Sequence, residues 1–191
     1  MDAQITPPNA AEPPKSRRWI WIGSSGALAL LLVVAGVVYF AVLPAMYFNT
    51  AHTYCDQGEY DRAIADYDKA IQLKPGYVEA YYDRGVAYYH KGNLDMAIDQ
   101  FEKVIHMAPQ YGIAYYHLGR AYTKKDFVDK AISVLEKLVE INPRDSDAFF
   151  HLGYSYWKNG KDDMAIGALQ KAIDLNPGDE TAKDIMKQLM R

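Results

Sequence analysis

Along most of the chain, apolar positions follow one another with the spacing of helices that bury a single face. One helix is marked by small or large apolar side chains three or four residues apart: Tyr81, Gly85, Tyr88 and Tyr89. This spacing predicts an amphipathic helix. Gly92 and Asn93 interrupt the pattern, as turn residues do. A second helical pattern follows, and Pro109 ends it because proline has no N–H and clashes with the preceding turn. The stretch therefore predicts a helical hairpin.

The same hairpin recurs at a constant interval along the chain. A proline closes each copy: Pro75, Pro109, Pro143 and Pro177. Each second helix opens with the pattern Asp-x-Ala-Ile, which begins at Asp61, Asp95, Asp129 and Asp163. A fixed period of about 34 residues indicates a unit stacked on copies of itself, since one hairpin cannot bury its apolar face alone.

The repeated residue types predict how the helices meet. An Asp near a helix start satisfies free N–H groups and suits the positive end of the helix dipole, so this role is expected for the four Asp-x-Ala-Ile aspartates. Small residues are expected where helices approach closely: Gly85, Gly119, Gly153 and the repeated alanines. Bulky residues are expected to fill the gaps between helices, among them Phe101, Leu135 and Leu169.

The units resemble the tetratricopeptide repeat (TPR) family. The resemblance rests on residue types at fixed positions counted from the start of each unit: a large residue at position 4, a small one at 8, Tyr at 11, Ala at 20 and Pro at 32. Units two to four satisfy this pattern. The first unit is weaker at its start. The resemblance implies an all-α solenoid of four helical hairpins, at residues 44–77, 78–111, 112–145 and 146–179. A last amphipathic stretch, residues 180–191, predicts a capping helix because the end of a solenoid needs a polar outer surface.

An apolar stretch without ionisable side chains runs over residues 19–43. As a helix, residues 19–40 cover roughly 33 Å, enough for a hydrocarbon core of about 30 Å. Aromatic residues near both ends suit the two membrane interfaces, and Tyr47 and Phe48 are expected near the headgroups. We predict a transmembrane helix at 19–43 acting as an uncleaved signal-anchor. The alternatives are a buried helix and a cleaved signal peptide, whose apolar core is usually shorter, at about 7–15 residues.

The tail before this stretch predicts the orientation in the membrane. Residues 1–18 are rich in proline, lack apolar periodicity and are expected to be a disordered cytoplasmic tail. Lys15, Arg17 and Arg18 precede the apolar stretch, whereas the next cation after it is Arg62. The bias of cations towards the cytoplasm predicts a cytoplasmic N-terminus and an extracytoplasmic repeat domain, in a periplasm, a lumen or the cell exterior.

Composition excludes several classes of function. Beyond the tail and apolar stretch, 18 Lys and Arg stand against 22 Asp and Glu. This acidic balance, without a basic stripe, argues against nucleic-acid binding. Cys55 is the only cysteine, so no disulfide forms within the chain. The five histidines show no metal-binding spacing, and no phosphate-binding loop or nucleophile–base motif is present. We predict no catalytic residue, metal or cofactor.

The first helix of each unit has a second face, which in this family lines the concave groove. Aromatic rings are abundant there, and rings are favoured where proteins hold other chains. The predicted peptide-binding groove comprises Tyr82, Asp83, Tyr89, Tyr116, His117, Arg120, Phe150, His151, Tyr154 and Trp157. Thr123, Lys124 and Lys158 share that face, whereas Tyr88, Tyr122 and Tyr156 are interpreted as core. Some family members grip an acidic C-terminal tail with Lys, Asn and Arg. The matching positions here hold Phe48, His52, Ile113 and His117, so that clamp is absent.

These features predict a non-catalytic, membrane-anchored adaptor or scaffold that binds a protein or peptide partner in its groove, as an accessory factor in assembly or translocation. Two alternatives remain open at this stage. One is a structural module that self-assembles into homo-oligomers, and the other is an accessory subunit of a membrane enzyme complex.

Overall fold

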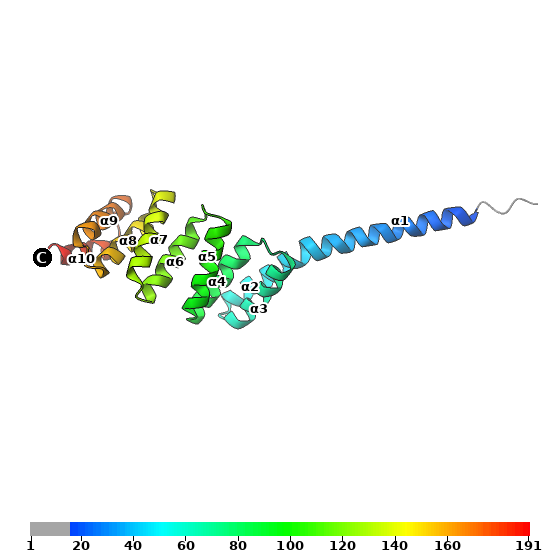
Figure 1. Cartoon of the computed structure of the whole chain (residues 1–191), viewed down its shortest axis with the longest axis horizontal. Helices are drawn as coiled ribbons and strands as arrows, with labels where there is room; N and C mark the ends of the chain where they lie inside the picture. The colour runs from blue at the N-terminus through cyan, green and yellow to red at the C-terminus, as the bar shows by residue number, and fades with distance from the viewer. Residues whose placement is uncertain (1–15) are drawn as a thin grey trace, which may run out of the picture. The chain divides into compact units, whose positions relative to one another are not determined.

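The computed structural model describes the backbone of residues 16–191 and the side chains of residues 26–191; the tail predicted to be disordered lies, as far as residue 15, outside the described residues. All regular structure in the described part is helical. An N-terminal unit of helices precedes a repeat domain, which begins at Leu43. Figure 1 labels the helices in chain order. Their bounds are α1 (Ser16–Val37), η1 (Val38–Val42), α2 (Leu43–Asp56), α3 (Tyr60–Leu73), α4 (Val78–Lys91), α5 (Leu94–Met107), α6 (Gly112–Lys124), α7 (Val128–Ile141), α8 (Ser146–Lys158), α9 (Asp162–Leu175) and α10 (Glu180–Leu189).

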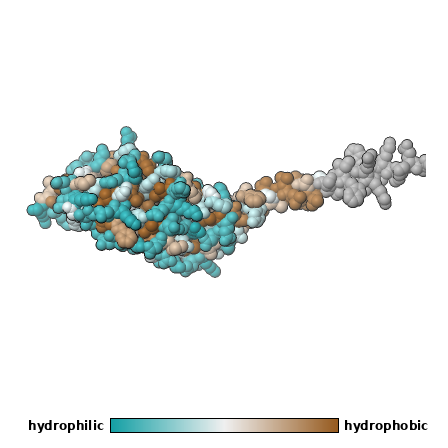
Figure 2. All heavy atoms as spheres, in the orientation of Figure 1, coloured by the Kyte–Doolittle hydropathy of each residue, from teal (hydrophilic) through white to brown (hydrophobic). Residues whose placement is uncertain are grey.

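The N-terminal unit is one apolar helix whose described side chains are exposed. Leu31 and Phe40 expose 65% and 68% of their surface, and the stretch forms a continuous hydrophobic surface in Figure 2. Of the described helices, this one alone is long and apolar enough to cross a membrane, although a signal sequence would meet the same criteria. The short π-helix η1 ends just before Leu43 and Pro44. A π turn accommodates the missing N–H of proline and its clash with the carbonyl four residues earlier.

The repeat domain is an α-solenoid of stacked helix pairs, α2–α3, α4–α5, α6–α7 and α8–α9 (Figure 1). Within each pair the two helices pack together, and the second helix of one pair packs on the first helix of the next. After each first helix the chain reverses through a residue with positive φ. That residue is Gly58, Gly92 and Gly160 in three pairs, but Asp126 in the third, with φ of 63°. Glycine adopts this conformation without steric cost, and aspartate tolerates it better than most residues.

The predicted close approach between helices is confirmed, and it pairs a small residue with a large one sixteen positions later. A Cβ on Gly119 would lie 2.7 Å from Leu135 Cγ, and one on Gly85 would lie 2.7 Å from the Phe101 ring. The alanines of the four Asp-x-Ala-Ile patterns are fully buried: Ala63, Ala97, Ala131 and Ala165. Tyr122 and Tyr156 are buried as expected, and their hydroxyls donate to the preceding repeat's Glu102 and Glu136, at 2.5 and 2.6 Å.

The aspartates of the Asp-x-Ala-Ile patterns match part of the expectation, because each lies in the first turn near the positive end of the helix dipole, but they do not act as N-caps. The N-cap residues of α3, α5, α7 and α9 are other residues, and their side chains accept no hydrogen bond from the helix backbone. Instead, Asp61 pairs with Lys91 at 2.5 Å and Asp95 pairs with Lys125. In the next repeat, Asn159 donates to Asp129 at 3.1 Å. In each contact the partner lies one repeat further along the chain, so the repeated aspartates join neighbouring repeats.

Tyr47 and Phe48, the two aromatic residues expected near lipid headgroups, are partly buried and pack against the core of the first repeat. The Phe48 ring lies 5.0 Å from the Tyr77 ring and 5.8 Å from the Tyr67 ring. Tyr47 packs against the same cluster of buried residues. At the other end of the domain, α10 packs on α9 and buries Ala182 and Ile185. The apolar face at the C-terminal end of the solenoid is therefore covered by α10.

Candidate peptide-binding groove

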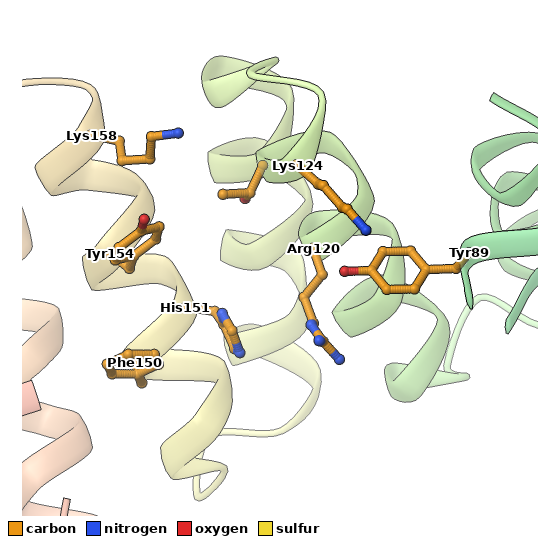
Figure 3. Close-up of a pocket in the computed structure, with 8 residues that line it drawn as sticks. Tyr89, Arg120, Lys124, Phe150, His151, Tyr154 and Lys158 are labelled. Carbon is orange, nitrogen blue, oxygen red and sulfur yellow. The ribbon is translucent and has the colours of Figure 1, made fainter. Parts of the chain in front are cut away.

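An open pocket of about 450 Å³ lies across the first helices of three successive repeats. Figure 3 shows side chains converging on it from α4, α6 and α8. The lining residues are Tyr89, Arg120, Thr123, Lys124, Phe150, His151, Tyr154 and Lys158. Its volume falls within the roughly 300–1,000 Å³ of typical ligand sites. Residues three and four apart share one side of a helix, so each of these helices has a second face besides the one that packs in the core. This second face is left uncovered on the inside of the curved stack.

Aromatic rings hold the cations of this pocket in place. The Arg120 guanidinium lies 5.4 Å from the ring centroids of both Tyr89 and Tyr116, and Lys124 Nζ lies 5.0 Å from the Tyr89 ring. Such contacts stabilise a cation without neutralising it. Among the side chains that the structure describes, neither Arg120 nor Lys124 has a carboxylate within ion-pair distance. Lys158 contacts exposed Asp126 at 3.1 Å. The pocket wall therefore carries net positive charge.

His151 and Tyr116 join two walls of the groove. The Tyr116 hydroxyl lies 3.3 Å from His151 Nε2, within hydrogen-bonding distance, and Figure 3 shows the imidazole turned towards α6. Burial lowers the pKa of His151, and the positive charge of Arg120 lowers this pKa further. The imidazole is consequently neutral near pH 7, and its hydrogen bond fixes α8 relative to α6.

Tyr82 and His117 are half-buried and do not line this pocket. The His117 ring lies 5.5 Å from Tyr82 and 5.6 Å from Phe101. Its Nδ1 atom is buried and has no hydrogen-bond partner among the described residues. Burial lowers the pKa of His117 to about 4, with Arg120 and His90 contributing in the same direction. Both side chains pack on Phe101 instead.

Asp83 lies in a separate, smaller hollow of about 230 Å³ between the first and second repeats. Its carboxylate is 3.7 Å from His52 Nδ1. Burial raises the pKa of Asp83 to about 6; His52 opposes the shift and Glu79 adds to it. Asp56 also lines this hollow, which makes it the acidic end of the inner face.

The ten residues predicted for the groove are thus divided by the structure. Tyr89, Arg120, Phe150, His151 and Tyr154 line the pocket. Tyr116 supports it, whereas Trp157 stacks edge-on against Tyr154 and packs towards α10. Thr123, Lys124 and Lys158 line the pocket although they were outside the predicted set. The signal for the two lysines was present, because they occupy equivalent positions in successive repeats.

The comparisons with known proteins identify the repeats. Models described as TPR repeat or tetratricopeptide repeat match residues 51–92, 78–111 and 116–180. A search of curated proteins found no match. Among solved structures, a MamA fragment from Desulfovibrio magneticus RS-1 is 25% identical, with a TM-score of 0.75; the alignment covers 78% of this chain and 85% of the fragment.

Two further solved structures are similar. A crystal structure of MamA is 29% identical, with a TM-score of 0.70. The alignment covers 73% of this chain and 81% of the MamA chain. The first TPR of Spaghetti, bound to an HSP90 peptide, has a TM-score of 0.58. It is 19% identical, and the alignment covers 59% of this chain and 90% of the Spaghetti chain. This similarity supports a likeness in fold alone. With four stacked helix pairs and family matches along them, this chain is a tetratricopeptide repeat protein.

Proposed function

We propose that this protein is a non-catalytic adaptor, anchored in a membrane by its N-terminal helix, that holds a segment of a partner polypeptide in the groove across α4, α6 and α8. The N-terminus lies in the cytoplasm and the repeat domain on the opposite side. The observation that carries the proposal is the open pocket of rings and cations, since TPR domains are protein-binding scaffolds. Amphipathic rings with few rotamers bind polypeptides at low entropic cost.

The exposed apolar helix supports the anchor. Soluble proteins rarely expose contiguous apolar surface of more than a few hundred Å². Here the stretch 26–42 has no buried residue, and its large side chains, including Leu31 and Phe40, are exposed. A hydrocarbon environment removes the cost of that exposure. The cations Lys15, Arg17 and Arg18, which precede the apolar stretch, support the orientation, because such residues are retained on the cytoplasmic side.

Membrane fractionation tests the anchor and its orientation. We expect the full chain to stay in the membrane pellet through alkaline carbonate extraction and to be released by detergent, with an intact mass near 21.6 kDa. A tag after Arg191 should be reached by protease added to the outer face of intact cells or spheroplasts, whereas a tag at Met1 should be protected. A mature chain lacking the apolar helix would instead identify a cleaved signal sequence.

Site-specific photocrosslinking tests the groove. With benzoylphenylalanine at Phe150, we expect irradiated membranes to yield adducts in which one contiguous partner segment is joined to the groove. The matched control places the same group at Phe127, which is 44% exposed but does not line the pocket, and should give few adducts. Adducts only between copies of this chain would replace the adaptor with a self-assembling module. Equal adduct yields at both positions would contradict the groove as the binding surface.

A further inference from the structure

The pocket across α4, α6 and α8 differs in charge from the rest of the repeat domain. The chain beyond its tail and apolar stretch has more carboxylates than cations, with 22 Asp and Glu against 18 Lys and Arg. Even so, the pocket across α4, α6 and α8 is lined by Arg120, Lys124 and Lys158 and by no carboxylate. Asp56 and Asp83 line the hollow one repeat away, and Asp145 and Asp147 line another hollow on the other side of Tyr116. The pocket is therefore a positive site in an acidic domain.

The cations of the pocket are positioned to receive a ligand. Repeated aspartates elsewhere pair with cations of the next repeat, as Asp61 does with Lys91 and Asp95 does with Lys125. Arg120 and Lys124 instead rest on tyrosine rings, which leaves their N–H donors free of carboxylates among the described side chains. A guanidinium held on two rings loses little freedom when it binds a carboxylate, and that contact is charge-assisted.

The other lining residues indicate what accompanies the carboxylates. Phe150 and Tyr154 stack at 6.4 Å on the α8 wall, and Tyr89 stands on the α4 wall (Figure 3). These rings offer apolar surface beside the cations. The walls come from three helices and enclose a concavity, so a flat bilayer surface would not reach Arg120 as an extended polypeptide would. The shape favours a segment that crosses the first helices of successive repeats.

We propose that the occupant of this groove is an acidic segment of a partner polypeptide, with Asp or Glu side chains on Arg120 and Lys124 and an apolar residue against Tyr89, Phe150 and Tyr154. This inference rests on the proposed function and specifies the chemistry of the partner. It differs from a grip on a chain end, because the side-chain carboxylates of an internal segment supply the negative charge.

Selection from a random peptide library tests this chemistry without a known partner. The full chain, immobilised in mild detergent, selects from phage-displayed random dodecamers. We expect Asp and Glu to be enriched next to an aromatic or aliphatic residue. Reversing two charges, Arg120→Glu with Lys124→Glu, should abolish that enrichment and favour Lys and Arg. For a synthetic peptide of the selected sequence, amidated at its C-terminus, the reversal should weaken binding at least about 30-fold.

Matched variants separate local chemistry from net charge and from misfolding. Lys161→Glu with Lys171→Glu makes the same charge change on exposed positions in and beside α9 and should leave selection and affinity within about twofold. Lys124→Glu alone changes an exposed residue and should still weaken binding several-fold. Far-ultraviolet circular dichroism of each variant checks the fold. Raising the salt concentration should weaken the native complex, since partly exposed ion pairs are screened.

The outcomes distinguish this inference from the proposed function. Enriched peptides without excess Asp and Glu, or equal binding by the charge-reversed protein, would overturn the acidic partner and leave a peptide groove. No enriched peptide at all would argue against both. Binding of the protein to vesicles that contain phosphatidylserine is a further measurement. If they bound through Arg120 and Lys124 while acidic peptides did not, the pocket would be assigned to lipid headgroups and the inference would be wrong.

Discussion

Phe101→Ala is expected to lower the free energy of unfolding by about 3–5 kcal/mol, the usual cost of deleting a fully buried phenylalanine. The Phe101 ring has no exposed surface and occupies the space left by the missing side chain of Gly85. It also lies 6.1 Å from the Tyr82 ring and 5.6 Å from His117. The helix backbone at Gly85 cannot move in to fill the cavity. Urea unfolding of the full chain in mild detergent, followed by circular dichroism, measures the loss.

Two control variants on the same helix make this prediction specific. Phe101→Leu should cost less than about 1.5 kcal/mol, because leucine fills the equivalent position in two other repeats, as Leu135 opposite Gly119 and Leu169 opposite Gly153. Met96→Ala, at a side chain that is 45% exposed, should change stability by no more than about 0.5 kcal/mol. A similar loss for Phe101→Ala and Met96→Ala would contradict the close packing of α4 and α5.

His117→Phe is expected to remove a loss of stability that the native protein suffers in acid. Burial holds the pKa of His117 near 4 in the fold, whereas an unfolded histidine titrates near 6.5. The folded state therefore binds fewer protons between these values. The native protein therefore has its full stability above about pH 6.5. It loses the part that depends on an uncharged His117 as pH falls to about 4. The unfolding free energy of the variant should gain roughly 2–3 kcal/mol on the native value over that range.

Asp83→Asn provides a control of opposite sign. Burial raises the pKa of Asp83 to about 6, so its ionised form is disfavoured in the fold. The native protein therefore loses stability relative to the variant as pH rises from about 4 to about 6. Urea unfolding at a series of pH values should give difference curves of opposite slope for the two variants. A flat curve for His117→Phe would show that the imidazole is solvated and not buried among the rings.

Several features of the fold are predictable because they depend on local sequence. The constant repeat period marks every hairpin, and Gly85 and Gly119 meet Phe101 and Leu135 as expected, since small residues mark the close approach of helices. The role of Asp61 was predicted only in part: it lies in the first turn of α3 as expected, but its contact with the next repeat was not foreseen. A capping rule considers only the helix on which a residue lies, whereas Asp61 faces the next repeat and pairs there with Lys91.

The candidate site was harder to predict, because helical periodicity shows on which face of a helix a residue lies but not how deeply its side chain is buried there. Tyr82 and Tyr89 share one face of α4, yet Tyr82 packs on Phe101 while Tyr89 lines the pocket. Trp157 lies on the predicted face of α8, but it packs against residues of α10. Lys124 lay outside the predicted set, although it shares that face of the helix and lines the pocket.

The sequence alone determined the helical repeats, their number and order, and an apolar stretch long enough to cross a membrane. These properties follow from the spacing and composition of neighbouring residues, which act through local helix geometry. Only the tertiary structure decided which side chains share a site. Stacking brings Tyr89 and Arg120, which belong to different repeats, into contact and leaves Asp83 in another hollow. That arrangement depends on how successive repeats pack, and it gives the groove its localised positive charge.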